Sequence, residues 1–188
     1  MRPLGKTAGA LATWMLIAPA LAQEKAKPSP DLQPKPAPAL VDAFREMTGT
    51  WVCKGKFQPM DGSGEMPSKS TMTVRVLLDG FAYAGEYQVE KNPVLPNGMR
   101  GASFWTYDAA YNKLVELYAD SFGNVGRGTS DGLAGDAVVW DQEAVMAGKI
   151  ARTRTSVKRV SPTVITLTFD LQTDGKWATM GVDTCTKQ

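Results

Sequence analysis

The chain has 188 residues, 43% of them hydrophobic and 21% charged, with 21 Lys and Arg residues against 19 Asp and Glu residues. This length suits one folded domain with additional segments, and the near balance of charge argues against nucleic acid or an anionic membrane surface as a partner. The sequence contains no histidine. This excludes His-ligated zinc or haem, and it excludes any nucleophile that a histidine would activate.

The first 22 residues have the layout of a secretory signal peptide. Arg2 and Lys6 precede an apolar run over residues 8–18, and a small-x-small cleavage site ends at Ala22. The apolar run is shorter than the about 20 residues that a membrane-spanning helix needs. We therefore expect cleavage after Ala22 and an exported protein, periplasmic or extracellular, without stable membrane insertion.

Residues 23–39 are expected to form a Pro-rich disordered linker, either a plain tail or a tether, because they hold five of the twelve prolines. The folded domain is expected over residues 40–188. At its start, three apolar residues recur at the spacing of one helical face: Leu40, Phe44 and Met47. Gly49 follows them, so the pattern predicts a short N-terminal helix at about residues 40–48.

After this helix the sequence consists of strand-like runs separated by turn residues about every ten positions. The runs span residues 49–57, 69–78, 81–90, 100–107, 113–119, 126–130, 137–142, 149–160, 164–171 and 177–186. Tight turns join antiparallel strands, and a closed sheet has no exposed edge. The sequence therefore predicts an all-β domain, an antiparallel up-and-down β-barrel of about ten strands that is wide enough to enclose a small ligand.

The two cysteines fall at opposite ends of the predicted barrel sequence. Cys53 lies in the first strand and Cys185 in the last. These strands become neighbours when an up-and-down barrel closes, and an exported protein meets an oxidising compartment. We therefore expect a disulfide between Cys53 and Cys185, closing a loop of about 130 residues, with two free thiols as the alternative.

Several stretches resemble known barrel families. The helix that leads into Gly49, Thr50 and Trp51 resembles the opening of lipocalin-like barrels. Further similarity is to an exported bacterial family described as a domain of unknown function (DUF1579), and it is carried by residues 98–101, 104–108, 119–123, 128–132 and 151–155. That family's barrel is similar to those of lipocalins, fatty-acid-binding proteins and nitrobindins. The resemblance implies a lipocalin-like, or calycin, barrel and no established activity. Nitrobindins hold haem through histidine, so we expect no haem or other cofactor here.

Polar side chains inside a barrel are costly unless they are paired, so they are candidate ligand contacts. The polar candidates are Glu86, Glu116, Asp120, Arg152 and Arg154, and either arginine is suited to binding a carboxylate or phosphate. The candidates for an apolar wall are Tyr87, Trp105, Tyr107 and Trp140. Two other interpretations of the arginines stay open: a structural contact with a carboxylate or with Trp51, and a position facing solvent.

The predicted function is non-catalytic binding of a small hydrophobic or amphipathic ligand inside the barrel. One alternative is an envelope interaction or structural module whose barrel is filled by its own side chains. Another is a lyase or isomerase without histidine, with Glu116 or Asp120 as the acid–base group and a tyrosine as donor. The sequence shows no assembled catalytic set and no metal site, so it favours a binding protein over an enzyme.

Overall fold

The computed structural model describes residues 34–59, 62, 64–146 and 148–188. The predicted signal peptide and residues 23–33 of the predicted linker lie outside these residues. The helix α1 spans Pro38–Phe44. It begins two residues earlier than the pattern predicts, because a proline in the first helical turn has no N–H group that would need a partner. Residues 45–47 form a turn, so the helix also ends before the predicted position.

Within the described residues, eleven strands follow α1, and a short 3-10 turn, η2 (Leu78–Gly80), joins the second strand to the third. The strands are β1 (Gly49–Phe57), β2 (Met66–Leu77), β3 (Ala82–Val89), β4 (Met99–Asp108), β5 (Lys113–Asp120), β6 (Val125–Ser130), β7 (Leu133–Ala134), β8 (Ala137–Met146), β9 (Lys149–Ser161), β10 (Val164–Thr173) and β11 (Lys176–Lys187). All except β7 correspond to a predicted run. The two residues of β7 are too few to show an alternating pattern.

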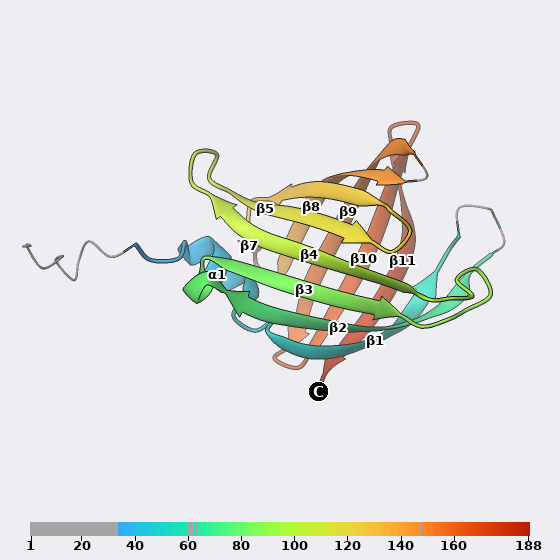
Figure 1. Ribbon diagram of the computed structural model, residues 1–188, viewed down its shortest axis with the longest axis horizontal. Helices are drawn as coiled ribbons and strands as arrows, with labels where there is room; N and C mark the ends of the chain where they lie inside the picture. The colour runs from blue at the N-terminus through green and yellow to red at the C-terminus, as the bar shows by residue number, and fades with distance from the viewer. Residues whose placement is uncertain (1–33, 60–61, 63, 147) are drawn as a thin grey trace, which may run out of the picture. The chain divides into compact units, whose positions relative to one another are not determined.

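The strands pair in an antiparallel ring (Figure 1). Each long strand pairs with its neighbour in the chain, β1 pairs with β11, and β6 pairs with β8 across the short β7. Ten strands therefore close the barrel, and β7 adds only to one end of β8. The predicted fold class is confirmed.

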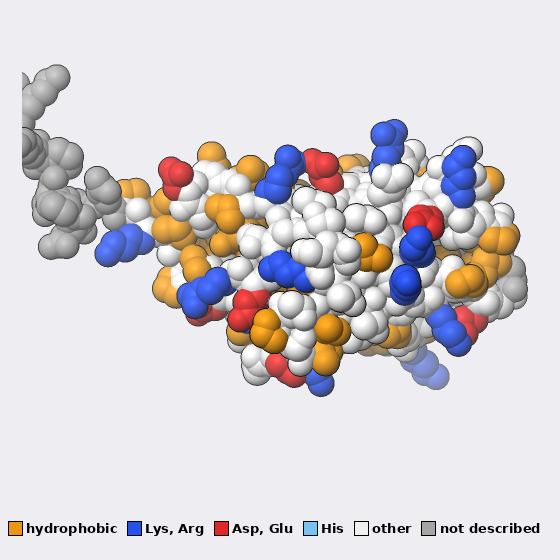
Figure 2. Space-filling model, turned by 90° about the horizontal axis from the view of Figure 1, so that it is seen from below, with side chains coloured by type: hydrophobic (Ala, Val, Ile, Leu, Met, Phe, Trp, Pro, Cys, Tyr) orange, Lys and Arg blue, Asp and Glu red, His pale blue; other side chains and the backbone are white. Residues whose placement is uncertain are grey.

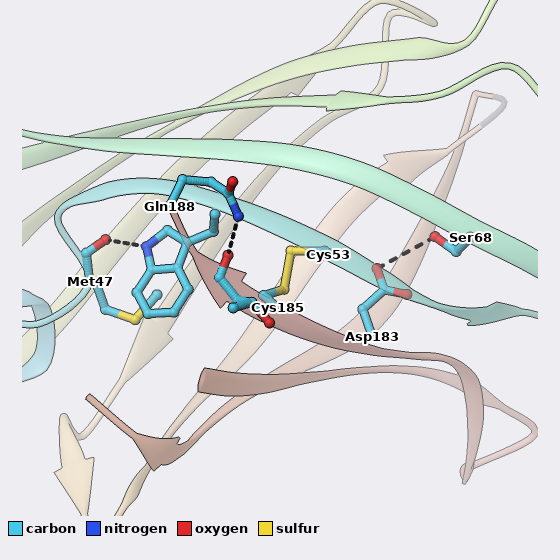
Figure 3. The surroundings of a disulfide bond; sticks show 8 residues. Met47, Cys53, Ser68, Asp183, Cys185 and Gln188 are labelled. Carbon is cyan, nitrogen blue, oxygen red and sulfur yellow. Dashed lines mark hydrogen bonds between the residues drawn. A yellow bond between two sulfur atoms is a disulfide. The ribbon is translucent and has the colours of Figure 1, made fainter. Parts of the chain in front are cut away.

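A disulfide holds the first and last strands together. Cys53 and Cys185 are direct partners in the β1–β11 register and are bonded to each other, with a Cα–Cα distance of 3.9 Å (Figure 3). Both residues are buried, and 132 positions separate them in the sequence. The predicted pairing is therefore present, and it lies at the point where the chain's first and last strands meet.

The helix α1 closes one end of the barrel, as the ribbon shows (Figure 1). Its apolar face and the turn that follows are buried: Leu40, Phe44 and Met47. The Phe44 ring enters an aromatic cluster, with ring centroids at 4.8 Å from Tyr83, 5.0 Å from Trp105 and 6.3 Å from Trp140. The Trp51 indole N–H donates to the Met47 carbonyl oxygen at 2.8 Å, which ties β1 to the helical segment.

Two basic side chains bind backbone carbonyls at the end of α1. Arg159 donates to the Ala43 carbonyl at 3.0 Å, and Lys187 donates to the Glu46 carbonyl at 3.0 Å. The last carbonyls of a helix lack intrahelical partners and attract cations. The Lys187 ammonium also lies 5.4 Å from the ring centre of Trp51. The cation beside Trp51 is therefore this lysine and not one of the two candidate arginines.

We expect the double substitution Cys53→Ala and Cys185→Ala to lower the free energy of unfolding by about 3–5 kcal/mol, because the bridge restricts the unfolded chain over a long loop. Urea denaturation of the oxidised protein and the variant measures the difference. Reduced wild-type protein is the control and should match the variant. Equal stability of oxidised wild type and variant would contradict a stabilising bridge.

Candidate functional site

The solvent exposure of the inward side chains changes along the axis of the barrel. Near α1 the inner face holds the most deeply buried side chains of the barrel, and five of them are at most 4% exposed: Trp51, Val74, Tyr83, Leu114 and Ile165. Toward the other end, residues that alternate inward keep intermediate exposure: Tyr87, Gly101, Tyr118, Gln142, Thr153 and Thr155. These residues face the interior of a closed ring, so solvent reaches them from the end opposite α1. We call this part of the interior the open half, and it is the candidate site.

Three aromatic side chains of the inner face lie against glycines of neighbouring strands. A Cβ atom added to the glycine would lie 2.4 Å from the Trp105 ring at Gly85, 2.2 Å from the Tyr87 ring at Gly101, and 2.1 Å from the Tyr118 ring at Gly126. A side chain at any of these positions would displace the ring. The glycines therefore allow the aromatic rings to pack along the barrel wall.

A hydrogen-bonded network around Glu116 forms the floor of the open half. The Glu116 side chain is buried and accepts a hydrogen bond from Gln142 Nε2 at 2.7 Å. Burial raises the pKa of Glu116, and hydrogen bonding by Gln142, Ser103 and Trp105 opposes this rise. Gln142 Oε1 in turn accepts from the Thr155 hydroxyl at 2.9 Å, so the network joins β5, β8 and β9.

A second buried carboxylate, Asp183 on β11, lies across the ring from β5, with equal numbers of strands between them in both directions. It fits there because its neighbour Gly55 has no side chain: a Cβ atom would lie 2.3 Å from Asp183 Oδ1. The Ser68 hydroxyl donates to Oδ2 at 3.5 Å (Figure 3). Among the described residues this carboxylate has no other hydrogen bond and no ion pair. Burial raises the pKa of Asp183.

Two tyrosines and an aspartate complete one wall. Burial raises the pKa of Tyr87 and of Tyr118, and the negative charges of Asp120 and Glu116 raise both further. Both phenols therefore stay protonated at neutral pH. Asp120 lies at the rim, where its oxygens accept the backbone N–H of Asn124 at 3.1 Å and the Asn124 side-chain amide at 2.9 Å. The Asp120 carboxylate thus holds the β5–β6 turn by hydrogen bonds, and its negative charge raises the pKa of both tyrosines.

The predicted inward contacts divide between the two ends of the barrel. Four of them share one wall of the open half or its floor: Tyr87, Trp105, Glu116 and Asp120. The other two belong to the α1 end. Trp140 is 4% exposed within the aromatic cluster, and the Tyr107 hydroxyl donates to Asn112 Oδ1. The structure therefore does not bring all six together around one ligand position. The prediction that Glu86 faces inward is wrong, because Glu86 is exposed on the outer face of β3, where it pairs with Arg75.

The two candidate arginines lie on the outer face, which is the solvent-facing arrangement left open by the sequence. Arg154 donates to Asp141 from Nε at 2.9 Å and lies 4.4 Å from the ring centre of Trp177. Arg152 is exposed, opposite Glu143 in the register. These side chains line a hollow of about 450 Å³, which Gln142 and Thr153 also line. Both arginines alternate outward on β9, whereas Thr153 alternates inward.

The outer face carries charges of both signs. In the space-filling view, Lys and Arg side chains lie among Asp and Glu side chains without a large patch of one sign (Figure 2). Several pairs are in contact: Lys56 with Glu65 at 2.6 Å, Lys69 with Glu90 at 2.5 Å, and Arg127 with Glu143 at 3.2 Å. A second outer hollow, of about 420 Å³, is lined by exposed aliphatic side chains of Leu117, Val125, Val145 and Ile150. Charge on this surface is thus locally balanced.

Two further properties limit the chemistry of the described part of the chain. No three carboxylate or cysteine side chains in it gather closely enough to hold a metal ion. No helix in the same residues has the length and apolar character needed to cross a membrane.

Sequence reasoning missed three residues of the open half. Each lies two positions from a residue that the sequence singled out: Asp183 before Cys185, Tyr118 after Glu116, and Gln142 after Trp140. Strand alternation places residues two apart on one face, so the signal was present in the sequence. Apolar patterning does not reveal it, because all three side chains carry polar groups.

The fold and inner face define a class of protein, the closed antiparallel barrel with one plugged and one open end. Among solved structures, the chain is similar to Rv2717c from M. tuberculosis, with a TM-score of 0.60 and 9% identity over 82% of this chain and 99% of that one. It is also similar to a redesigned β-barrel (TM-score 0.43, 15% identity, 78% and 96% covered) and to a de novo designed fluorescence-activating β-barrel (0.41, 14%, 79% and 99%).

The likeness to Rv2717c shows the fold alone, because the sequence identity is so low. No protein-family model matches the chain, and no curated protein matches it. The resemblance to the DUF1579 family therefore stays a prediction, while the barrel that it implies is present.

We expect Asp183→Asn to stabilise the protein at alkaline pH. Burial raises the pKa of Asp183 above its ordinary 3.8, so the folded state favours the protonated carboxyl, and this contribution is lost as pH rises through the raised pKa. Asparagine does not ionise. The variant should therefore be more stable than wild type by about 1 kcal/mol above the raised pKa, and of similar stability below pH 3.8. Chemical denaturation across pH measures both values.

The matched control is Asp174→Asn, in the exposed turn between β10 and β11. Its stability should follow the wild-type pH dependence. An Asp183→Asn variant that is destabilised at every pH would contradict the assignment of Asp183 as a costly buried charge.

Proposed function

We propose that the protein binds a small, partly apolar ligand in the open half of the barrel and does not transform it. The observation that carries this proposal is the intermediate exposure of inward side chains in a closed ring, as at Tyr87, Tyr118 and Gln142. Aromatic walls with a few fixed polar groups are the usual composition of small-molecule sites. A ligand entering from the open end would meet such walls.

The floor supports a site with a single entrance. The Glu116 network joins β5, β8 and β9 between the two halves, and beyond it the α1 end is packed with the aromatic cluster around Phe44. We propose that the alternative of a barrel filled by its own side chains describes the α1 end only. The barrel combines a packed half that supplies stability with an accessible half that offers surface to a ligand.

A lyase or isomerase is the second candidate, favoured by one observation. Glu116 is a buried carboxylate, and burial raises its pKa. Its negative charge also raises the pKa of the nearby Tyr87 phenol. A general base needs an oxygen directed at the substrate, whereas Glu116 Oε2 already accepts a hydrogen bond from Gln142. The contacts of Glu116 therefore support a positioning role in the floor better than proton transfer.

We propose further that the protein is exported and that its signal peptide is cleaved after Ala22. The disulfide supports this location, because such bridges persist in oxidising compartments. Expression of the full chain in a Gram-negative host should give periplasmic protein whose N-terminal residue is Gln23, as measured by intact-mass spectrometry. The substitution Ala22→Lys removes the small residue at the cleavage site and should leave precursor. Mature-length protein from that variant, or wild-type precursor in the cytoplasm, would contradict the proposal.

A tryptophan at Ser70 should block the open half. Ser70 alternates inward on β2 beside Cys53, whereas the next residue, Thr71, is exposed on the outer face. We expect Ser70→Trp to weaken binding of the neutral apolar probe N-phenyl-1-naphthylamine about tenfold or more, because the indole occupies the ligand's volume. Probe fluorescence measures the affinity, and thermal melting confirms folding of both variants.

Thr71→Trp is the matched control, because it adds the same side chain to the opposite face of the strand. It should bind the probe as wild type does. Equal affinities of Ser70→Trp and Thr71→Trp would show that the probe binds elsewhere. Native mass spectrometry of wild-type protein from the periplasm complements this test by revealing any co-purified small molecule.

A further inference from the structure

An apolar row crosses five strands on the outer face of the barrel. The register places its members side by side, from β4 through β5, β6 and β8 to β9: Ala102, Ala119, Val125, Val145 and Ile150. All five are exposed. Neighbouring strands lie about 4.8 Å apart, so the row is about 19 Å wide. The solvated face of an antiparallel sheet is normally polar, so an unbroken apolar row indicates a face that contacts something other than water.

The next row toward α1 adds two larger apolar side chains and a pair of opposite charges. Phe104 and Leu117 lie in this row on β4 and β5 and are exposed. Arg127 and Glu143 continue it on β6 and β8. Side chains of both rows line the hollow of about 420 Å³. We call the apolar row together with Phe104 and Leu117 the outer apolar face.

The outer apolar face is large enough to serve as an interface. Ile150 is 78% exposed, Leu117 55% and Val125 49%. The apolar side chains of the face together expose on the order of 500 Å², a size at which such patches usually mark interaction sites. The adjoining charged pair brings the surface close to the roughly 800 Å² that each partner contributes to a standard interface.

The charged pair beside this face is self-complementary. Arg127 and Glu143 are in contact within the chain at 3.2 Å, and their side chains are 77% and 47% exposed. When two copies face each other, a two-fold axis parallel to the strands and between β6 and β8 exchanges the positions of these two strands. Arg127 of each copy then faces Glu143 of the other. This match of charges favours a second copy of the chain over an unrelated partner.

The same axis also matches side-chain sizes. In the apolar row the side chains grow from Ala119 on β5 through two valines to Ile150 on β9. The exchange of strands places Ile150 of one copy over Ala119 of the other, so that a protruding side chain meets a shallow position. Val125 of each copy faces Val145 of the other. Interfaces that pack well have this kind of complementary shape.

We propose that the protein forms a two-fold symmetric homodimer through the outer apolar face, with β6 and β8 of both copies at its centre. Burial of the apolar side chains drives the association, and the contacts between Arg127 and Glu143 of different copies fix the register. The contact lies on the outer wall of the barrel. The proposed dimer therefore leaves the open half free and does not depend on the proposed ligand binding.

Sedimentation equilibrium of the oxidised protein measures the association. We expect a dimer with a dissociation constant below about 100 μM at low salt. Val125→Glu places a charge at the centre of the contact and should weaken association at least about tenfold. Val182→Glu is the matched control, because Val182 is 43% exposed on the outer face of β11, outside the proposed contact. It should associate as wild type does, and thermal melting confirms that both variants fold.

Charge reversal tests the two-fold contact itself. Arg127→Glu and Glu143→Arg each place like charges opposite one another, so each variant alone should associate about tenfold more weakly than wild type. In an equimolar mixture, residue 127 of each variant faces a charge of opposite sign at residue 143 of the other variant. The mixture should therefore regain the wild-type association, although the pair within each chain stays broken.

Three results would overturn the proposal. Wild-type protein that stays monomeric at about 100 μM is the first, and its co-sedimentation with phosphatidylcholine vesicles would then assign the outer apolar face to a membrane surface. Equal association of wild type, Val125→Glu and Val182→Glu is the second, because the contact would then lie elsewhere. A mixture of the two charge variants that associates no more tightly than either variant alone is the third.

Discussion

The pairing of β1 with β11, bonded through Cys53 and Cys185, is the constraint on which the interior depends. It closes the sheet into a ring, and closure gives each strand one face that points inward. The second closing contact, between β6 and β8, has backbone pairing but no covalent bond. On an unclosed sheet, Asp183 and Glu116 would lie on a face open to water, and burial would not raise their pKa values.

The two halves of the interior have different roles: the α1 end stabilises the fold, and the open half is the candidate binding site. At the α1 end, aromatic and aliphatic side chains pack around Phe44, and burial of this apolar surface stabilises the fold. At the floor, the barrel accepts two buried carboxylates. Among the described residues, Glu116 accepts a hydrogen bond from Gln142 at 2.7 Å and Asp183 accepts a longer one from Ser68 at 3.5 Å. The second is a cost to folding that the packed end offsets. Local costs of this kind are typical of positions kept for function.

Turn chemistry and alternation predicted the fold well, and β1 coincides with its predicted run because glycines and prolines mark both of its ends. The candidate site was predicted in part. Tyr87 and Glu116 share an inner face as alternation implies, but Arg152 and Arg154 do not. On β9 the threonines that alternate with them, Thr153 and Thr155, face inward, and apolar patterning gives no sign of this choice because neither face of the strand is strongly hydrophobic. Asp183 was missed for a related reason: it is a polar residue on an inward face.

An electron-density map of the oxidised protein tests most directly whether closure leaves an accessible interior. We predict ordered solvent, or a bound small molecule, between the tyrosines of β3 and β5 and the Asp183 carboxylate, with the helix sealing the far end. Density in which side chains from opposite walls pack against each other throughout that space, with no room for solvent, would contradict it.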